Sequence, residues 1–320
     1  MILVTGATGF LGSEVVRQLK EQGRPVIALK RTGSVVPQAL SGPDITWRDA
    51  DLLNYFDLEE ALEGVTAVFH CAARISFDPG EKRELIRVNR ESTANIANLC
   101  MERNIRLLHV SSVSAVGEAK NGGPATEKDM WMFSHRQTGY AISKYESEME
   151  VWRAIAEGLD AVIVNPSIIL GTHAGLSGSG RLFEQVRKGL RFYPRGGCGL
   201  TDVRDVASVM VRLMDSGITG ERYIVNAENW TYRDLFAEIA AGLHVRPPAV
   251  PAPEWLLRAA AAAGNLLRLT GNRRFGLTSE TARSASRTPL YSNEKIRKTL
   301  EMEFRPVKQT IREICQNIPT

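Results

Sequence analysis

The sequence is poor in the residues that stabilise a protein through disulfides or metal ions. Its 320 residues include only four cysteines, none of them in a Cys-x-x-Cys pair, and five histidines without metal-ligand spacing. This scarcity argues against a zinc site and against a disulfide framework. We therefore expect a protein of a reducing compartment, the cytoplasm, with no bound metal.

Long apolar runs and a strong charge of one sign are also missing. No stretch approaches the roughly 18 apolar residues of a membrane span, and strand-forming residues from Ile2 onward leave no room for a signal peptide. The net charge of +4 is too small to predict nucleic-acid binding. Residues 246–320, however, contain 13 Lys or Arg and 6 Asp or Glu. This basic portion favours an anionic substrate or a membrane surface, and a solvated basic face is the simpler interpretation.

The first half of the chain alternates short β-branched runs with longer amphipathic stretches. The runs are mostly continuous in apolar residues, which predicts strands that are covered on both faces. Strands are predicted at 2–7, 25–30, 45–50, 66–73, 105–112 and 160–167, and helices near 13–22, 57–63, 82–103 and 140–157. This order predicts an α/β fold with a doubly wound parallel sheet of the Rossmann type.

The pattern changes after residue 170, where four glycines between Gly171 and Gly180 predict a loop. Later predictions are helices near 181–189, from Asp205, at 231–243 and at 254–271, a glycine-rich loop before Asp205, and a strand at 222–228. We expect a dinucleotide-binding domain at 1–170 and about 200–228. A smaller, mainly helical C-terminal substrate lobe would comprise about 171–199 and 229–320. The Ala-rich helix 254–271, followed by Arg273 and Arg274, suits close helix packing or a membrane surface.

The glycine-rich segment TGATGFLG (5–12) directly follows the first predicted strand and opens the first predicted helix. Its glycines are spaced GxxGxxG, one residue longer than the common dinucleotide fingerprint. Glycine permits a tight turn, a close approach of the backbone to a pyrophosphate, and close packing of helix on strand. We expect a dinucleotide to bind at this turn, through Thr5, Gly6, Thr8, Gly9, Phe10, Leu11 and Gly12.

The end of the second predicted strand lacks the acidic residue that would accept the ribose 2′-hydroxyl of NAD. Lys30 and Arg31 occupy this place. A cationic pair attracts a 2′-phosphate, and arginine can bind it with two hydrogen bonds. The sequence therefore favours NADP (NADPH) as the cofactor, with NAD still possible.

Candidate catalytic residues follow the fifth predicted strand. Ser112 lies at its carboxyl end, where ligands of such sheets bind. Tyr140 and Lys144 open a helix 28 residues later and share one face of it. A lysine cation stabilises a phenolate and moves its pKa from about 10 toward the operating range. Tyr140 then becomes a usable general acid or base.

Five motifs in order, TGATGFLG, VFHCAA, SSVSAVG, YAISK and NPS, resemble the extended short-chain dehydrogenase/reductase family, also called the NAD(P)-dependent epimerase/dehydratase family. The resemblance runs from Ile2 to about Ala227. It implies that Ser112 polarises the substrate oxygen, with Ser111 and Ser114 as less favoured alternatives, and that Tyr140 exchanges the proton beside Lys144. Tyr140 and Lys144 would also contact the cofactor. Further cofactor contacts implied by the resemblance are Asp51 and Leu52 at the adenine, Cys71, Ala72 and Ala73 near the ribose, Asn89, and Asn165, Pro166, Ser167 and Ile168 at the nicotinamide.

The reaction class follows from what surrounds these motifs. Dehydratases of this family carry an acidic pair after the active hydroxyl, whereas Val113, Ser114 and Ala115 follow Ser112. The chain looks most like the branch of dihydroflavonol reductases, cinnamoyl-CoA reductases and aldehyde reductases. We expect an NADP(H)-dependent oxidoreductase that reduces an aldehyde or ketone carbonyl of a small apolar or aromatic substrate.

Two alternatives stay open. One is a nucleotide-sugar epimerase with tightly bound NAD, in which Arg181, Arg195 and Arg204 would bind a diphosphate. The other is a non-catalytic NADP-binding sensor or assembly protein.

Some features suit two interpretations. Trp131, Met132 and Phe133, with Phe77, either line an apolar substrate pocket or anchor a loop. His70 and His109 on predicted strands are expected to be packed core residues. The resemblance also implies a possible homodimer through the helices 82–103 and 140–157.

Overall fold

The computed structural model describes residues 1–119, 121–134, 137–174, 178–253, 255, 259 and 279–318. Apart from residues 255 and 259, the predicted Ala-rich helix 254–271 lies outside the described residues, as do Arg273 and Arg274. No helix among the described residues has the length and apolar character needed to cross a membrane.

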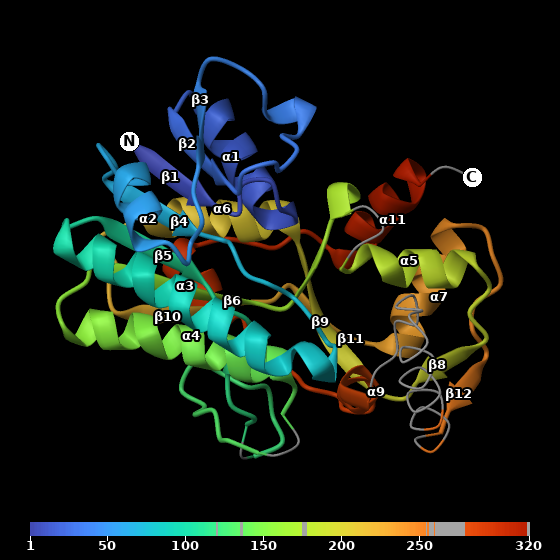
Figure 1. The fold of residues 1–320 in the computed structure, drawn as a ribbon. Coiled ribbons are helices and arrows are strands. Elements are labelled where there is room, and N and C mark those ends of the chain that lie inside the picture. The colour runs from blue at the N-terminus through green and yellow to red at the C-terminus, as the bar shows by residue number, and fades with distance from the viewer. Residues whose placement is uncertain are drawn as a thin grey trace.

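A seven-stranded parallel sheet forms the centre of the larger part of the molecule (Figure 1). Its strands are, in order across the sheet, β10 (Glu221–Val225), β6 (Ala161–Pro166), β5 (Arg106–Val110), β4 (Ala67–His70), β1 (Ile2–Thr5), β2 (Val26–Lys30) and β3 (Ile45–Asp49). The chain builds outward from β1 to β3 and then returns to β4 on the other side of β1. This reversal makes the sheet doubly wound, which confirms the predicted fold class, and it places a ligand crevice at the carboxyl ends of β1 and β4.

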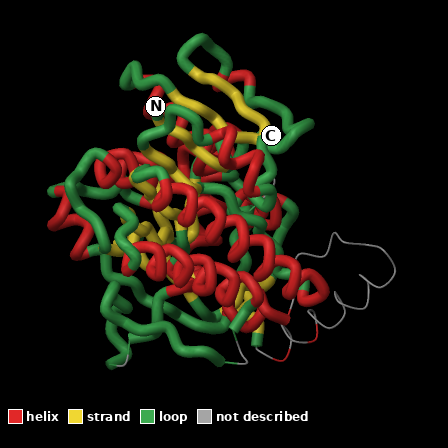
Figure 2. Tube along the Cα trace, turned by 60° about the vertical axis from the view of Figure 1, so that its left-hand side comes forward, coloured by secondary structure: helices red, strands yellow, loops and turns green. Residues whose placement is uncertain are grey.

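Helices cover both faces of the sheet (Figure 2). Successive residues of a strand point to opposite faces, so each strand has apolar side chains to bury on both sides. On one face Val4 and its neighbours pack against Val16 and Met210, in a cluster with α1 (Phe10–Glu21), α6 (Val203–Met214) and α10 (Glu294–Leu300). On the other face Leu3 packs in a cluster with Leu99, beneath α2 (Tyr55–Ala61), α3 (Lys82–Glu102) and α4 (Gly139–Ala156). Tyr140 and Lys144 lie on α4 and therefore on this face of the sheet.

A smaller lobe, at the right of Figure 1, has its own apolar cluster around Phe183, Leu200 and Ile311. Its helices are α5 (Gly180–Arg187), α7 (Tyr232–Gly242), α9 (Ser279–Ala285) and α11 (Val307–Asn317). It also contains two small sheets, β7 (Ile168–Leu170) with β9 (Gly197–Asp202) and β11 (Glu228–Thr231), and β8 (Phe192–Pro194) with β12 (Val250–Ala252).

The strand β9 occupies part of the segment for which the sequence predicted a glycine-rich loop. Its glycines serve close packing instead of chain reversal. A Cβ on Gly196, just before β9, would lie 2.1 Å from the carbonyl oxygen of Arg287, and one on Gly199 would lie 2.4 Å from Asn226 Oδ1. The lobe is therefore less purely helical than predicted, because backbone segments approach each other where side chains are absent.

Candidate active site

The glycine turn between β1 and α1 has the geometry that a pyrophosphate site requires. Gly6 has φ +64, and a Cβ there would lie 2.8 Å from the backbone nitrogen of Ala72. A Cβ on Gly12 would lie 2.2 Å from Gly6 O, so only glycine fits either position. Gly9 is the N-cap of α1, without a side-chain cap and without an acidic residue in the first turn. The amide groups at the start of α1 can therefore bind an anion.

The other residues predicted to bind the cofactor lie at or beside this turn. Thr8, Phe10 and Leu11 are half-buried. Thr5 Oγ1 accepts a hydrogen bond from Ala72 N (3.1 Å) and lies 2.8 Å from His70 Nδ1. These contacts join the ends of β1 and β4, so the turn and the segment Cys71–Ala73 form one unit.

Asn89 on α3 fixes the segment that continues from Ala73. Its Oδ1 accepts from Arg74 N (2.8 Å), and its Nδ2 donates to Arg74 O (2.9 Å) and to Ser143 Oγ (3.2 Å). Asn89 therefore orders the backbone beside the predicted ribose site and connects it to α4, the helix of Tyr140 and Lys144.

At the end of β2 the two cationic residues differ. Lys30 forms an ion pair with Asp49, at the end of the neighbouring β3. Arg31 is exposed, and its guanidinium makes no ion pair with the residues that the structure describes. Arg31 is thus the better placed of the two for a phosphate. Asp51 is exposed after β3, and Leu52 is half-buried with its carbonyl bound by Asn95 Nδ2 (3.0 Å).

The structure brings Ser112, Tyr140 and Lys144 together. Ser112, at the end of β5, is the N-cap of the short 3-10 helix η3 (Val113–Ala115), and its Oγ accepts from Ser114 N (3.2 Å). The Ser112 hydroxyl lies close enough to the Tyr140 phenol to lower its pKa. Lys144 is buried and donates from Nζ to Val110 O (2.8 Å), the last carbonyl of β5. The hydroxyl, the phenol and the amine therefore meet at the carboxyl end of β5.

Burial dominates the electrostatics of this group. It lowers the pKa of Lys144 to about 8, against the attraction of Cys71 and Glu148. Burial raises the pKa of the Tyr140 phenol, while the hydrogen bond with Ser112 lowers it. The resulting shift is opposite to the one expected from the Lys144 charge, because desolvation disfavours the phenolate more than Ser112 stabilises it.

Sequence reasoning missed the residues beneath this group. Glu148 on α4 is fully buried, one helical turn beyond Lys144. Its carboxylate binds Ser111, Asn165 and Arg222. The sequence signal that could have identified Glu148 is its spacing, because a carboxylate four residues after Lys144 and eight after Tyr140 lies on the same face of a helix.

The residues predicted at the nicotinamide lie at the end of β6. Asn165 Nδ2 donates to Ser112 O (3.0 Å), and Asn165 and Ser167 are buried. Pro166 ends β6, and Ile168 opens β7. This chain segment crosses directly from the large sheet to the smaller lobe.

The aromatic residues near Tyr140 divide into two roles. The Phe77 ring lies 5.5 Å from the Tyr140 ring, centre to centre, and is partly exposed. Trp131 stacks on Tyr145 at 4.1 Å and donates from Nε1 to Ser114 O (3.2 Å), so it is a packing anchor. Met132 and Phe133 are exposed.

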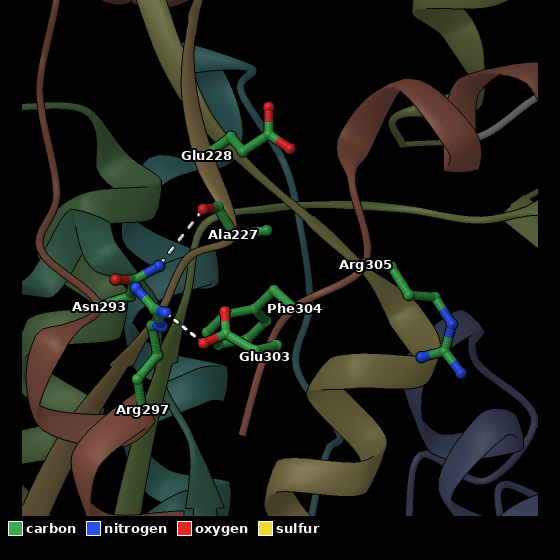
Figure 3. A pocket seen from close by; sticks show the side chains of 7 residues that line it. All are labelled: Ala227, Glu228, Asn293, Arg297, Glu303, Phe304 and Arg305. Carbon is green, nitrogen blue, oxygen red and sulfur yellow. Dashed lines mark hydrogen bonds and ion pairs between the residues drawn. The ribbon is translucent and has the colours of Figure 1, made fainter. Parts of the chain in front are cut away.

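Other possible sites are of a different kind. A small cavity of about 90 Å³ is lined by Ala227 and Glu228 and by side chains between residues 293 and 305 (Figure 3). Its Arg297 and Arg305 form ion pairs with Glu303 and Asp205. Among the described residues no three His, Cys, Asp or Glu side chains group as metal ligands.

The chain is similar to known proteins over most of its length. Residues 2–226 match the model of the NAD dependent epimerase/dehydratase family. A putative dihydroflavonol 4-reductase of Synechocystis sp. is 34% identical, over 79% of this chain and 75% of the relative. Sterol demethylase protein B of Methylococcus capsulatus is 35% identical over 72% of this chain and 70% of the relative. The crystal structure of gox2253 superposes with a TM-score of 0.84 and 30% identity, covering 99% of this chain and 97% of that one.

The matched residues span the glycine turn, Ser112, Tyr140, Lys144 and the end of β6. The chain therefore belongs to the NAD-dependent epimerase/dehydratase family and is an NAD(P)-dependent oxidoreductase of the extended short-chain dehydrogenase/reductase type.

Proposed function

We propose that the protein reduces an aldehyde or ketone carbonyl with NADPH, and that Ser112, Tyr140 and Lys144 are its catalytic residues. The observation that carries this proposal is that the Ser112 hydroxyl, the Tyr140 phenol and the Lys144 amine meet at the carboxyl end of β5, with Tyr140 and Lys144 one helical turn apart on α4. Two hydroxyl groups that meet in this way can both hydrogen-bond one carbonyl oxygen.

The protein side of the reaction then has three parts. Ser112 Oγ and the Tyr140 hydroxyl orient and polarise the carbonyl. Tyr140 donates its proton to the oxygen as negative charge develops there, and the Lys144 cation stabilises the phenolate that remains. The bound cofactor supplies the hydride. The raised pKa of Tyr140 keeps the phenol protonated at neutral pH, as a proton donor requires.

The residues present fit a dinucleotide. The space that a Cβ on Gly6 or Gly12 would fill is kept free, and the start of α1 offers uncapped amide groups. The contacts proposed for Asp51, Leu52, Cys71, Ala72, Ala73, Asn89 and the segment 165–168 surround the same edge of the sheet. Exposed Arg31 supports a preference for NADPH, with Lys30 less available because of Asp49.

The surroundings of Tyr140 support an apolar or aromatic substrate. Phe77 contacts the Tyr140 ring, and Met132 and Phe133 present apolar surface to solvent. Two relatives are named for a dihydroflavonol and a sterol. A small flavonoid, aryl aldehyde or steroid ketone therefore belongs in the first substrate panel.

The epimerase alternative receives less support from the arginines on which it depends. Arg204 forms ion pairs with Asp202 and Glu313, which leaves its guanidinium little capacity to bind a diphosphate. Arg181 and Arg195 are exposed. Purified protein that carries NAD and fails to oxidise NADPH with any member of the carbonyl panel would favour the epimerase. Tight NADPH binding without turnover would favour the non-catalytic alternative.

Tyr140→Phe tests the catalytic assignment. It removes one hydroxyl, so carbonyl reduction should fall by roughly 100-fold to 10,000-fold, while NADPH affinity, measured by fluorescence titration, stays within about threefold. Tyr145→Phe is the matched control, because Tyr145 stacks on Trp131. Turnover by Tyr140→Phe close to that of the control contradicts the assignment.

Arg31→Ala tests the cofactor assignment. Loss of a charge-assisted contact with the 2′-phosphate should raise the KM for NADPH by roughly 10-fold to 100-fold, with little change in the KM for NADH. Steady-state kinetics with both cofactors measure the difference. A native enzyme that prefers NADH, or equal losses for both cofactors, would argue against Arg31 as the phosphate ligand.

The same proposal includes two points about the whole molecule. The chain divides into a dinucleotide-binding domain and a substrate lobe, and it forms a homodimer through α3 and α4. The exposed sides of α3 and α4 carry charged residues such as Arg87 with Glu84 and Glu91. A dimer through them would have a polar rim, and sedimentation velocity at low and high salt would detect it.

A further inference from the structure

We propose that Glu148 is a positioning residue of this active site, which holds Ser112 in place through Asn165 and keeps a negative charge beside Lys144. The inference rests on the proposed function, since it concerns the same serine and lysine. It adds a carboxylate that touches neither substrate nor cofactor and acts through both residues.

The first observation is the isolation of Glu148 from solvent. Its exposed fraction is 0%. A buried carboxylate is costly unless hydrogen bonds and a counter-charge compensate it. Glu148 has both. Oε2 accepts from Ser111 Oγ (2.6 Å) and Asn165 Nδ2 (2.8 Å), and Oε1 accepts from Trp152 Nε1 (3.1 Å) and Arg222 Nη1 (3.1 Å).

These partners lead directly to Ser112. Ser111 is its neighbour on the chain, and the same Asn165 amide that binds Glu148 also donates to Ser112 O (3.0 Å). The carboxylate thus fixes the end of β5 from two sides. The Ser112 hydroxyl acquires its orientation toward Tyr140 from a backbone that Glu148 holds.

Glu148 also acts on Lys144, one helical turn before it. The groups that act on the lysine come from three elements. His70 and Cys71 lie at the end of β4, His109 lies on β5, and Glu148 lies on α4 itself. Burial lowers the pKa of both histidines, which are therefore neutral, and raises the pKa of the Cys71 thiol to about 12. Of these groups, Glu148 is the carboxylate, and it forms an ion pair with Arg222.

Arg222 on β10 completes the arrangement. Besides Glu148, its guanidinium donates to Glu127 O (2.8 Å) and Asp129 O (3.0 Å). The segment 127–129 leads directly to Trp131, which binds Ser114 O. The Glu148–Arg222 pair thereby connects Ser112, Lys144 and the chain that returns over η3.

Only a carboxylate satisfies all four donors. A glutamine has one oxygen and one NH2 group, so its NH2 would face either Ser111 and Asn165 or Trp152 and Arg222. Glu148→Gln therefore removes the charge and disturbs one pair of hydrogen bonds, while keeping the side-chain volume. The lysine then loses the carboxylate that favours its cationic form.

The direct test measures Lys144 by NMR with ε-13C-labelled lysine, its signal assigned by its absence from Lys144→Met. We expect a native midpoint near pH 8 and a midpoint about one pH unit lower in Glu148→Gln. Glu150→Gln is the matched control, because Glu150 lies on the same helix and pairs with Arg90 and Arg153. Its Lys144 midpoint should equal the native one. Equal midpoints in Glu148→Gln and the native protein would overturn the proposal.

Enzyme activity gives a second measurement, the pH profile of kcat, which would not shift if Glu148 had only a structural role. With a reducible carbonyl, Glu148→Gln should lower kcat about tenfold at neutral pH and shift the alkaline limb of the kcat profile to lower pH, with KM nearly unchanged. If the native protein reduces no carbonyl, the proposed function fails while the NMR titration still decides the role of Glu148. A lowered kcat with an unshifted pH profile would overturn the inference and leave the proposed function intact.

A second variant guards against loss of folding, since Glu148→Gln leaves Arg222 without its carboxylate. Glu148→Gln/Arg222→Met removes both charges and retains apolar volume, which restores charge balance in the interior. We expect this double variant to unfold at a denaturant concentration near that of the native protein. Its Lys144 should still titrate at the lowered pH. A native-like Lys144 titration in the folded double variant would show that Glu148 does not set the lysine charge.

Discussion

Lys144 shows at the scale of one residue how the site opposes the stability of the fold. The residue is 5% exposed, and its amine has one hydrogen-bond partner among the described residues, the carbonyl of Val110. Burial lowers its pKa from the usual 10.5 to about 8, so the folded protein binds its proton more weakly than the unfolded chain does. The cation that we propose to stabilise a phenolate is therefore a source of instability at neutral pH.

We predict that Lys144→Met is more stable than the native protein at pH 7. The pKa difference corresponds to about 3 kcal/mol, and loss of the bond to Val110 returns about 1 kcal/mol of it, which leaves a gain of about 2 kcal/mol. Between pH 8 and 10.5 the unfolded chain binds more protons than the folded protein, so native stability rises relative to the variant. Urea unfolding at pH 7 and 10.5 should show the gain shrinking.

Exposed Lys128 provides the control, because Lys128→Met makes the same lysine-to-methionine exchange at a position on the surface. Its stability should stay within about 0.5 kcal/mol of the native value at both pH values. A Lys144→Met variant that is less stable than the native protein at pH 7 would contradict the pKa assigned to Lys144.

At the scale of elements, the return of the chain over η3 depends on one glycine. Gly117 is buried, and its amide donates to Asp129 O (3.2 Å). A Cβ there would lie 2.1 Å from Met130 O. A side chain at position 117 would therefore displace the segment that carries Trp131. Trp131 in turn is hydrogen-bonded to Ser114.

Gly117→Ala should therefore lower the free energy of unfolding by about 3 kcal/mol, through the steric overlap with Met130. Gly123→Ala is the matched control, because nothing lies within 4 Å of its Cβ position and its φ is not positive. Its stability should change by less than about 0.5 kcal/mol. Chemical denaturation of both variants measures the contrast, and equal values would mean that the segment shifts at little cost.

The elements that sequence predicts well are those with local causes. The parallel strands and the helix of Tyr140 follow from apolar periodicity, and the observed α4, Gly139–Ala156, begins one residue before the predicted helix. The small sheets of the lobe were missed because Gly196 and Gly199 resemble loop residues in sequence but serve backbone contact in space. The set around Glu148 was missed because its members, Ser111, Asn165 and Arg222, come from separate strands.

At the scale of the whole molecule, the C-terminal segment joins the two lobes. Ile296 and Leu300 of α10 pack on the large sheet, whereas Ile311 of α11 packs in the cluster of the smaller lobe. Between these helices, Arg305 forms an ion pair with Asp205 of α6, beside the cavity in Figure 3. The relative placement of the lobes, and hence the shape of the proposed substrate site at Tyr140, depends on such contacts far apart in sequence.

We predict that Arg305→Met destabilises the protein by about 2 kcal/mol at pH 7, because it leaves the buried Asp205 carboxylate without its counter-charge. Burial already raises the pKa of Asp205, and Arg305 opposes that rise. In the variant the folded-state pKa lies higher still, so the folded protein gains a proton as pH falls and the deficit shrinks in acid. Asp205→Asn/Arg305→Met should recover most of the loss at pH 7. Arg297→Met, whose partner Glu303 is exposed, should cost less than about 0.5 kcal/mol. A double-mutant cycle from urea unfolding at pH 5 and 7 measures the coupling, and a coupling near zero would mean that the Arg305–Asp205 pair contributes nothing to the stability of this junction.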